Sequence, residues 1–146
     1  MLKPLSVKKH VRILFLLLFV VFILNKLLIR PWVLENGSIE FVRLFVLSVP
    51  NLVEAFVGTL LLTGIFLQMR QHFKKYLGSI RDKDIYLIAA ALAGTYSISQ
   101  EFKLHNIGGN NVFDIYDVIA SIIGLLIAYG VILKYGFVDT SRFNED

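Results

Sequence analysis

Residues 11–29 read VRILFLLLFVVFILNKLLI, a nearly continuous apolar run that decides the fold class. A helix of about 20 apolar residues spans the hydrocarbon core of a bilayer. The run and its basic flank resemble a secretory signal peptide, but the run is longer than a signal core and no small-x-small cleavage site follows it. We therefore expect an uncleaved first membrane span over about residues 11–30.

The whole chain has the composition of a membrane protein. Of its 146 residues, 56% are hydrophobic and 18% are charged, which is too little polar material to cover a soluble domain of this length. Cysteine is absent, so disulfides, thiolate nucleophiles and cysteine metal ligands are excluded. Its net charge of +4 comes from basic residues at the ends of apolar runs. There they orient a membrane protein and contact anionic lipids, so we expect no nucleic-acid partner.

Three further apolar stretches predict a single all-α domain, a bundle of about four transmembrane helices. The stretch over residues 41–69 is too long for one span, and Pro50 offers a natural break. We expect an interfacial or tilted segment there, followed by a span over about residues 48–69. The remaining spans are expected over about residues 85–102 and 114–134.

The distribution of basic residues predicts the orientation of this bundle. With four spans, 11 of the 15 Lys and Arg residues fall in the N-terminus, the second loop and the C-terminal tail, and the other four fall in the first and third loops. Basic residues accumulate on the cytoplasmic side of membrane proteins. We therefore expect both ends of the chain in the cytoplasm.

With this orientation, most polar residues within the spans lie toward the outer side. Such residues are costly in a membrane and often mark a functional site. One explanation is a shared cavity, open to the outer face, that suits a lipid head group, a cation or a pair of proton-relay carboxylates. Its predicted lining residues are Glu54, Gln100, Glu101, Asp114, Asp117 and Ser121.

The alternative explanation is helix capping. Asn51-x-x-Glu54 and Asp114-x-x-Asp117 both resemble capping boxes, in which two side chains satisfy free backbone N–H groups. Capping does not explain Glu101, because an acid at a helix C-terminus opposes the helix dipole. The spacing of acids and histidines supports no metal site, and no cofactor motif is present.

Two segments of the second half resemble a known family. The segment Tyr96-Ser-Ile-Ser-Gln-Glu101 and the segment Phe113-Asp-Ile-Tyr-Asp-Val-Ile-Ala-Ser-Ile-Ile-Gly124 together resemble the VanZ-like family of small bacterial membrane proteins. That family has a helix bearing Glu or Gln, followed by the signature Asp-x-x-Asp-x-x-x-Asn-x-x-Gly. The resemblance covers about residues 90–130 and implies a multi-pass protein of the bacterial cytoplasmic (inner) membrane.

The match is partial within those segments. Asp114, Asp117 and Gly124 match the signature, and Glu101 or Gln100 matches the acid or amide position. Ser121 stands where the family usually has Asn, and Asn110 and Asn111 stand where an Arg usually precedes the first Asp. The family is associated with resistance to glycopeptide antibiotics of the teicoplanin type.

These observations leave three functions open. The first is an envelope protein that binds or acts on a lipid or amphiphile at the outward-facing acidic pocket. The second is a non-catalytic membrane subunit, whose third span is rich in Ala and contains Gly94, so that it packs against a partner protein or a second copy. The third is a proton- or ion-coupled carrier, which the carboxylates would permit. Neither the motifs nor the resemblance decides whether the chain is an enzyme.

Overall fold

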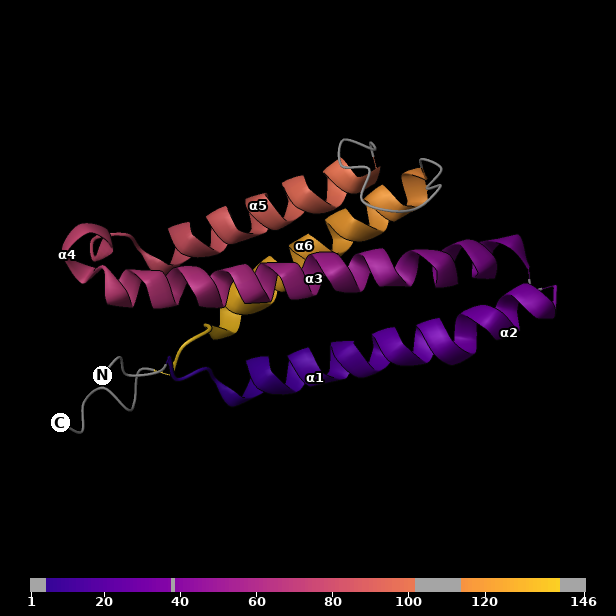
Figure 1. Ribbon diagram of the computed structural model, residues 1–146, viewed down its shortest axis with the longest axis horizontal. Coiled ribbons are helices and arrows are strands. Elements are labelled where there is room, and N and C mark those ends of the chain that lie inside the picture. Colours follow the sequence, from indigo (N-terminus) through magenta and orange to yellow (C-terminus); the bar gives the residue numbers. More distant parts are fainter. Residues whose placement is uncertain (1–4, 38, 102–113, 140–146) are drawn as a thin grey trace.

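The computed structural model describes residues 5–37, 39–101 and 114–139, and it confirms the all-α class (Figure 1). The N-terminal helix α1 (Lys9–Leu24) continues through a π-helical turn (Asn25–Ile29) into α2 (Arg30–Glu35). It is followed by α3 (Glu40–His72), the short α4 (Lys74–Leu77), α5 (Asp82–Glu101) and α6 (Ile115–Tyr135). Within the described ranges there is no strand, only an isolated antiparallel bridge between Val7 and Val138.

Three helical stretches of the described chain are long and apolar enough to cross a membrane: Lys9–Glu35, Glu40–His72 and Ile115–Tyr135. The helix α5 forms where the third span is expected, and its 20 residues are long enough, but its composition does not place it in this set. Its second half carries Thr, Ser and Gln residues among the apolar ones, and these polar residues lower its hydropathy. The three most apolar helices therefore have the length and composition of membrane spans.

The core of the bundle is formed by α3, α5 and α6, which approach one another at glycines. A Cβ on Gly124 of α6 would overlap the backbone carbonyl of Leu52 in α3. A Cβ on Gly94 of α5 would lie 2.8 Å from the Leu125 side chain of α6. Because lipid tails are as apolar as the side chains, close packing at small residues holds such helices together in a membrane.

The predicted break at Pro50 is wrong, because α3 continues through this residue from Glu40 to His72. Proline has no N–H, so the carbonyl of Val46 one turn earlier loses its usual donor within the helix. The side chain of Asn25 replaces that donor, since its Nδ2 lies 3.1 Å from the Val46 oxygen. Asn25 is buried, with 2% of its surface exposed. A residue from another helix thus satisfies the carbonyl that Pro50 leaves free.

A proline also explains the π-helical turn that begins at Asn25. Pro31 lies in the first turn of α2, directly after this segment. Pro31 cannot donate to the carbonyl of Leu27, and its ring crowds that carbonyl. A wider turn before a proline relieves the conflict without ending the helix. The first membrane helix therefore runs through Pro31 and ends at Glu35.

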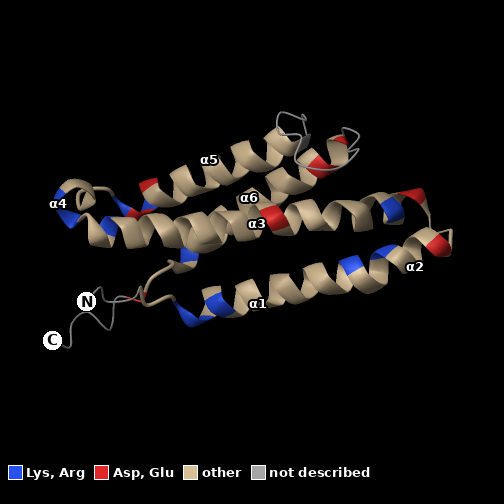
Figure 2. Ribbon diagram, viewed as in Figure 1, with Lys and Arg blue, Asp and Glu red and all other residues tan. Residues whose placement is uncertain are grey.

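The two ends of the bundle differ in charge (Figure 2). The end that holds the N-terminus of α1, the C-terminus of α3, α4 and the N-terminus of α5 is called here the basic end. The C-terminus of α6 lies there too, and the basic residues of this end are Lys8, Lys9, Arg12, Arg70, Lys74, Lys75, Arg81, Lys83 and Lys134. The opposite end holds the turn between α2 and α3 and the N-terminus of α6 (Figure 1).

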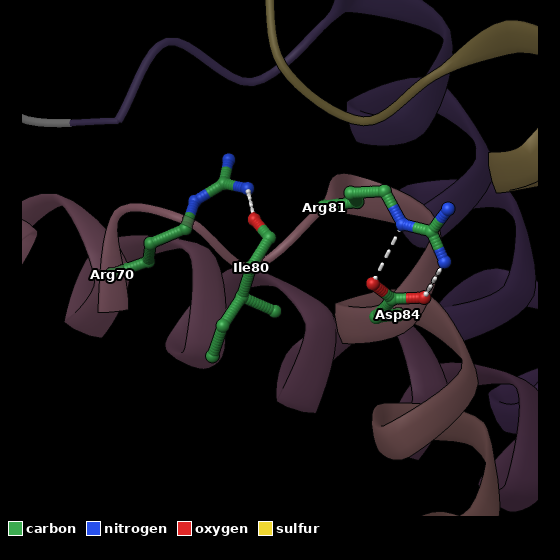
Figure 3. A network of polar contacts seen from close by, with 4 residues as sticks. All are labelled: Arg70, Ile80, Arg81 and Asp84. Atoms are coloured by element: carbon green, nitrogen blue, oxygen red, sulfur yellow. Dashed lines mark hydrogen bonds and ion pairs between the residues drawn. The ribbon is translucent and has the colours of Figure 1, made fainter. Parts of the chain in front are cut away.

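Polar contacts close the turn between α3 and α5 at the basic end (Figure 3). Arg70 donates to the carbonyl of Ile80 at 2.7 Å and pairs with Asp82 at 2.6 Å. Arg81 donates two hydrogen bonds to Asp84, at 2.9 and 3.0 Å. These bonds lower the pKa of Asp84 below its ordinary value. The Arg81–Asp84 pair is exposed, so it contributes little to stability.

Candidate functional site

Near its start, α6 presents polar residues toward the rest of the bundle. Ser121 is 2% exposed and Asp117 is half-buried, and both lie on the face that continues to Gly124, where α6 meets α3. Asp117 Oδ1 is buried and has no hydrogen-bond partner among the described residues. Ser48 of α3 is also buried, and its hydroxyl likewise lacks a partner there.

The capping interpretation is right for Asp114, whereas Asp117 Oδ1 has no hydrogen-bond partner among the described residues. Asp114 is the N-cap of α6, and its carboxylate accepts a hydrogen bond from the Tyr116 N–H at 2.9 Å. Asn51 and Glu54 lie in the interior of α3. Each backbone N–H there, except at proline, already donates to the carbonyl four residues earlier and needs no cap. The second capping box is therefore wrong, and Glu54 needs another explanation.

Glu54 lies on the surface of the bundle. Its side chain is exposed, whereas Thr63 is fully buried. Nine residues of α-helix turn the chain through about 900°, which places these two side chains on opposite faces of α3. Glu54 therefore points away from the buried face of α3, and Asp117 and Ser121 lie on a different surface of the bundle.

The remaining predicted site residues lie at the end of α5. Gln100 is half-buried, and Glu101 is the last residue of the helix. The side chain of Glu101 and the loop 102–113 lie outside the described residues. The shared outer cavity thus stays a prediction for Gln100, Glu101, Asp114, Asp117 and Ser121.

A large groove lies instead at the basic end, between α1 and α3. Its volume is about 1130 Å³. The groove extends along Phe15 and Leu16 of α1 and along Leu61, Gly64 and Ile65 of α3. It is open because α1 packs loosely: in α1, the π-helical turn and α2, the buried residues are Val11, Asn25 and Val33.

The chain termini form one wall of the groove. The backbone of Lys8 donates to the Phe137 carbonyl at 3.0 Å, and that of Asp139 donates to the Ser6 carbonyl at 2.8 Å. The Phe137 ring packs on the backbone of Gly64, where an added Cβ would lie 3.4 Å from the ring. Leu5 N–H also donates to Gln68 Oε1 at 3.2 Å. These contacts hold the basic end of α1 beside α3.

The rim of the groove is basic and its interior is apolar. Lys9 and Arg12 both line it, and both side chains are exposed. Neither residue forms an ion pair with another residue of the described ranges. Asp139 is the acid in the lining. The groove therefore combines cationic groups at one end with an apolar channel, which is the chemistry of an anionic amphiphile.

Sequence reasoning found these basic residues but assigned them only to membrane orientation. The groove depends on contacts between residues 5–9 and 136–139, which lie at opposite ends of the chain. No local pattern signals such a pairing. One local signal does exist for α1: its apolar residues surround the helix and form no single stripe, which is typical of a membrane span.

The described residues contain no group of three or more His, Asp or Glu side chains placed to hold a metal ion. No protein-family model, curated protein or solved structure matches this chain.

Proposed function

We propose that this chain is a four-span protein of the bacterial cytoplasmic membrane that binds an anionic lipid of the inner leaflet in the groove between α1 and α3. The observation that carries the proposal is the pairing of Lys9 and Arg12 with an apolar channel of about 1130 Å³. A lipid phosphate would lie beside the two cations, and an acyl chain would lie along Phe15 and Ile65. The proposal keeps the amphiphile ligand that the VanZ-like resemblance suggests.

The orientation follows from the same charges. Placing the basic end in the cytoplasm satisfies the positive-inside rule and puts the rim of the groove at the level of inner-leaflet phosphates. The described ends of the chain lie together at this basic end, as an even number of spans requires (Figure 1). In this arrangement α5 is the third of the four spans along the chain and packs against α3 and α6.

Lipid binding is tested with the double variant Lys9→Gln/Arg12→Gln. Each cation near a membrane surface contributes about 1 kcal/mol toward anionic lipid. Removing both should weaken phosphatidylglycerol binding roughly 30-fold, since about 1.4 kcal/mol corresponds to a factor of ten. Native mass spectrometry of the detergent-purified protein, titrated with phosphatidylglycerol or phosphatidylcholine, measures the change.

Two controls sharpen this experiment. The variant Lys74→Gln/Lys75→Gln removes the same charge from α4, outside the groove, and should leave phosphatidylglycerol binding nearly unchanged. Ile65→Trp fills the apolar channel and should weaken binding of both lipids, because it acts on the acyl chain. Equal losses in the groove and α4 double variants would contradict the proposed site.

The topology is tested by labelling single cysteines, because the natural chain has none. Asn36→Cys and Tyr116→Cys lie at the opposite end of the bundle, and Ser79→Cys lies at the basic end; all three positions are exposed. We expect a membrane-impermeant maleimide to label the first two in intact cells and to label Ser79→Cys only after lysis. Labelling of Tyr116→Cys only after lysis would show that α5 does not cross the membrane.

A further inference from the structure

Glu54 is a carboxyl group on the outer surface of the bundle, far from either end of its helix. Between Arg43 and Arg70 it is the only charged residue of α3. At 1.5 Å per residue it lies about 16 Å from the first arginine and about 24 Å from the second. Because the hydrocarbon core is about 30 Å thick, Glu54 lies deep within it.

No residue in the described part of the chain is a polar partner of this side chain. Glu54 is exposed, and it forms no hydrogen bond or ion pair with any described residue. Ionisable groups within membrane spans almost always face the interior of a bundle or pair with another group. A carboxyl group that faces outward from the bundle therefore indicates a surface that is covered in the membrane.

Asn51 lies one turn before Glu54 on the same side of α3 and is half-buried. It too makes no hydrogen bond with a described residue. An asparagine amide donates two hydrogen bonds, and a carboxyl group accepts them. The surface of α3 thus carries a donor and an acceptor on adjacent turns. When the same surface of a second copy faces it, the donor of each copy can bond to the acceptor of the other.

We propose that two copies of this chain associate through α3, with the Asn51 amide of each copy donating to the Glu54 carboxyl group of the other. A two-fold axis along the membrane normal places the same stretch of α3 from both copies at the same depth, so these two stretches contact each other. Hydrogen bonds between polar side chains are a principal attraction between helices in a membrane. A second copy supplies both of the groups that this surface requires.

Disulfide cross-linking in native membranes tests the dimer, since the chain has no cysteine of its own. Leu47→Cys lies seven residues before Glu54, on nearly the same face of α3 and outside the groove. It should form cross-linked dimers under mild oxidation. Leu126→Cys is the matched control, because Leu126 is 64% exposed on α6 and should give no dimer above background.

Variants of Glu54 identify the interaction. In the Leu47→Cys background, Glu54→Leu should weaken dimer formation roughly tenfold, because it removes the acceptor at the interface. Glu54→Gln keeps an acceptor and should retain the dimer. Since Glu54 forms no hydrogen bond or ion pair with the described residues of its own chain, Glu54→Leu should also insert with unchanged helix content by circular dichroism.

Three outcomes would overturn the proposal. The first is a yield of cross-linked dimer from α3 no greater than from Leu126→Cys. The second is unchanged dimer formation in the Glu54→Leu variant, or a loss of helix content in it. The third is cross-linking of α3 to a different protein in place of the homodimer. Because these variants leave Lys9 and Arg12 intact, a failed dimer test does not affect the lipid-binding test.

Discussion

Replacing Gly124 by alanine is expected to destabilise the bundle by about 2–3 kcal/mol, the upper part of the range for overpacking a close contact. The added methyl group would overlap the Leu52 carbonyl oxygen and lie 3.1 Å from its carbon. Both atoms belong to the backbone of α3, so no side chain can move aside. The two helices would have to separate, and the buried residues Ser121 and Ala128 on the same face of α6 would lose contact with α3.

Gly130 provides the control for this prediction. It lies in the same helix, but a Cβ there would meet no atom within 4 Å. Gly130→Ala should be neutral or stabilise α6 by up to about 1 kcal/mol, because alanine favours the helix. Unfolding in mixed micelles, followed by circular dichroism, measures both variants. Equal stability of the two would mean that α3 and α6 do not approach closely at Gly124.

The second large effect is expected for Asn25→Leu. This change removes the donor that satisfies the Val46 carbonyl and should cost about 1–3 kcal/mol, the usual range for a buried polar group left without its partner. It should also release the π-helical turn and α2 from α3, because Asn25 and Val33 are the buried residues of these two elements. Trp32 is the only tryptophan of the chain, so its fluorescence reports the release.

A double-mutant cycle with Pro50→Ala tests the physical reason. Alanine at position 50 restores an N–H one turn after Val46, and α3 can then satisfy this carbonyl itself. In that background Asn25→Leu should cost at least about 1 kcal/mol less than in the natural chain. Asn36→Leu is the control, since Asn36 is exposed and bonds only to Trp32 within its own helix. An identical cost of Asn25→Leu in both backgrounds would show that Pro50 and Asn25 are not coupled.

Some features of the candidate site depend on neighbouring residues in the sequence, and others depend on contacts between distant residues. The N-cap role of Asp114 and the shared face of Asp117 and Ser121 could be predicted, because capping and helical spacing involve residues a few positions apart. The position of Glu54 could not. A span that is apolar on every side carries no stripe to show which face is buried, so only the packing of α5 and α6 on α3 places Glu54 outside.

The sequence by itself determined the all-α class, the apolar stretches from which the long helices form and the charge difference between the ends of the bundle. These properties depend on runs of neighbouring residues, which must match the bilayer thickness and the charge of its surfaces. Tertiary structure alone decided the continuity of α3 through Pro50 and the groove beside Lys9 and Arg12. The first depends on a donor from Asn25, and the second depends on the pairing of Val7 with Val138. In each case the decisive contact joins residues that only folding brings together, and no local preference encodes it.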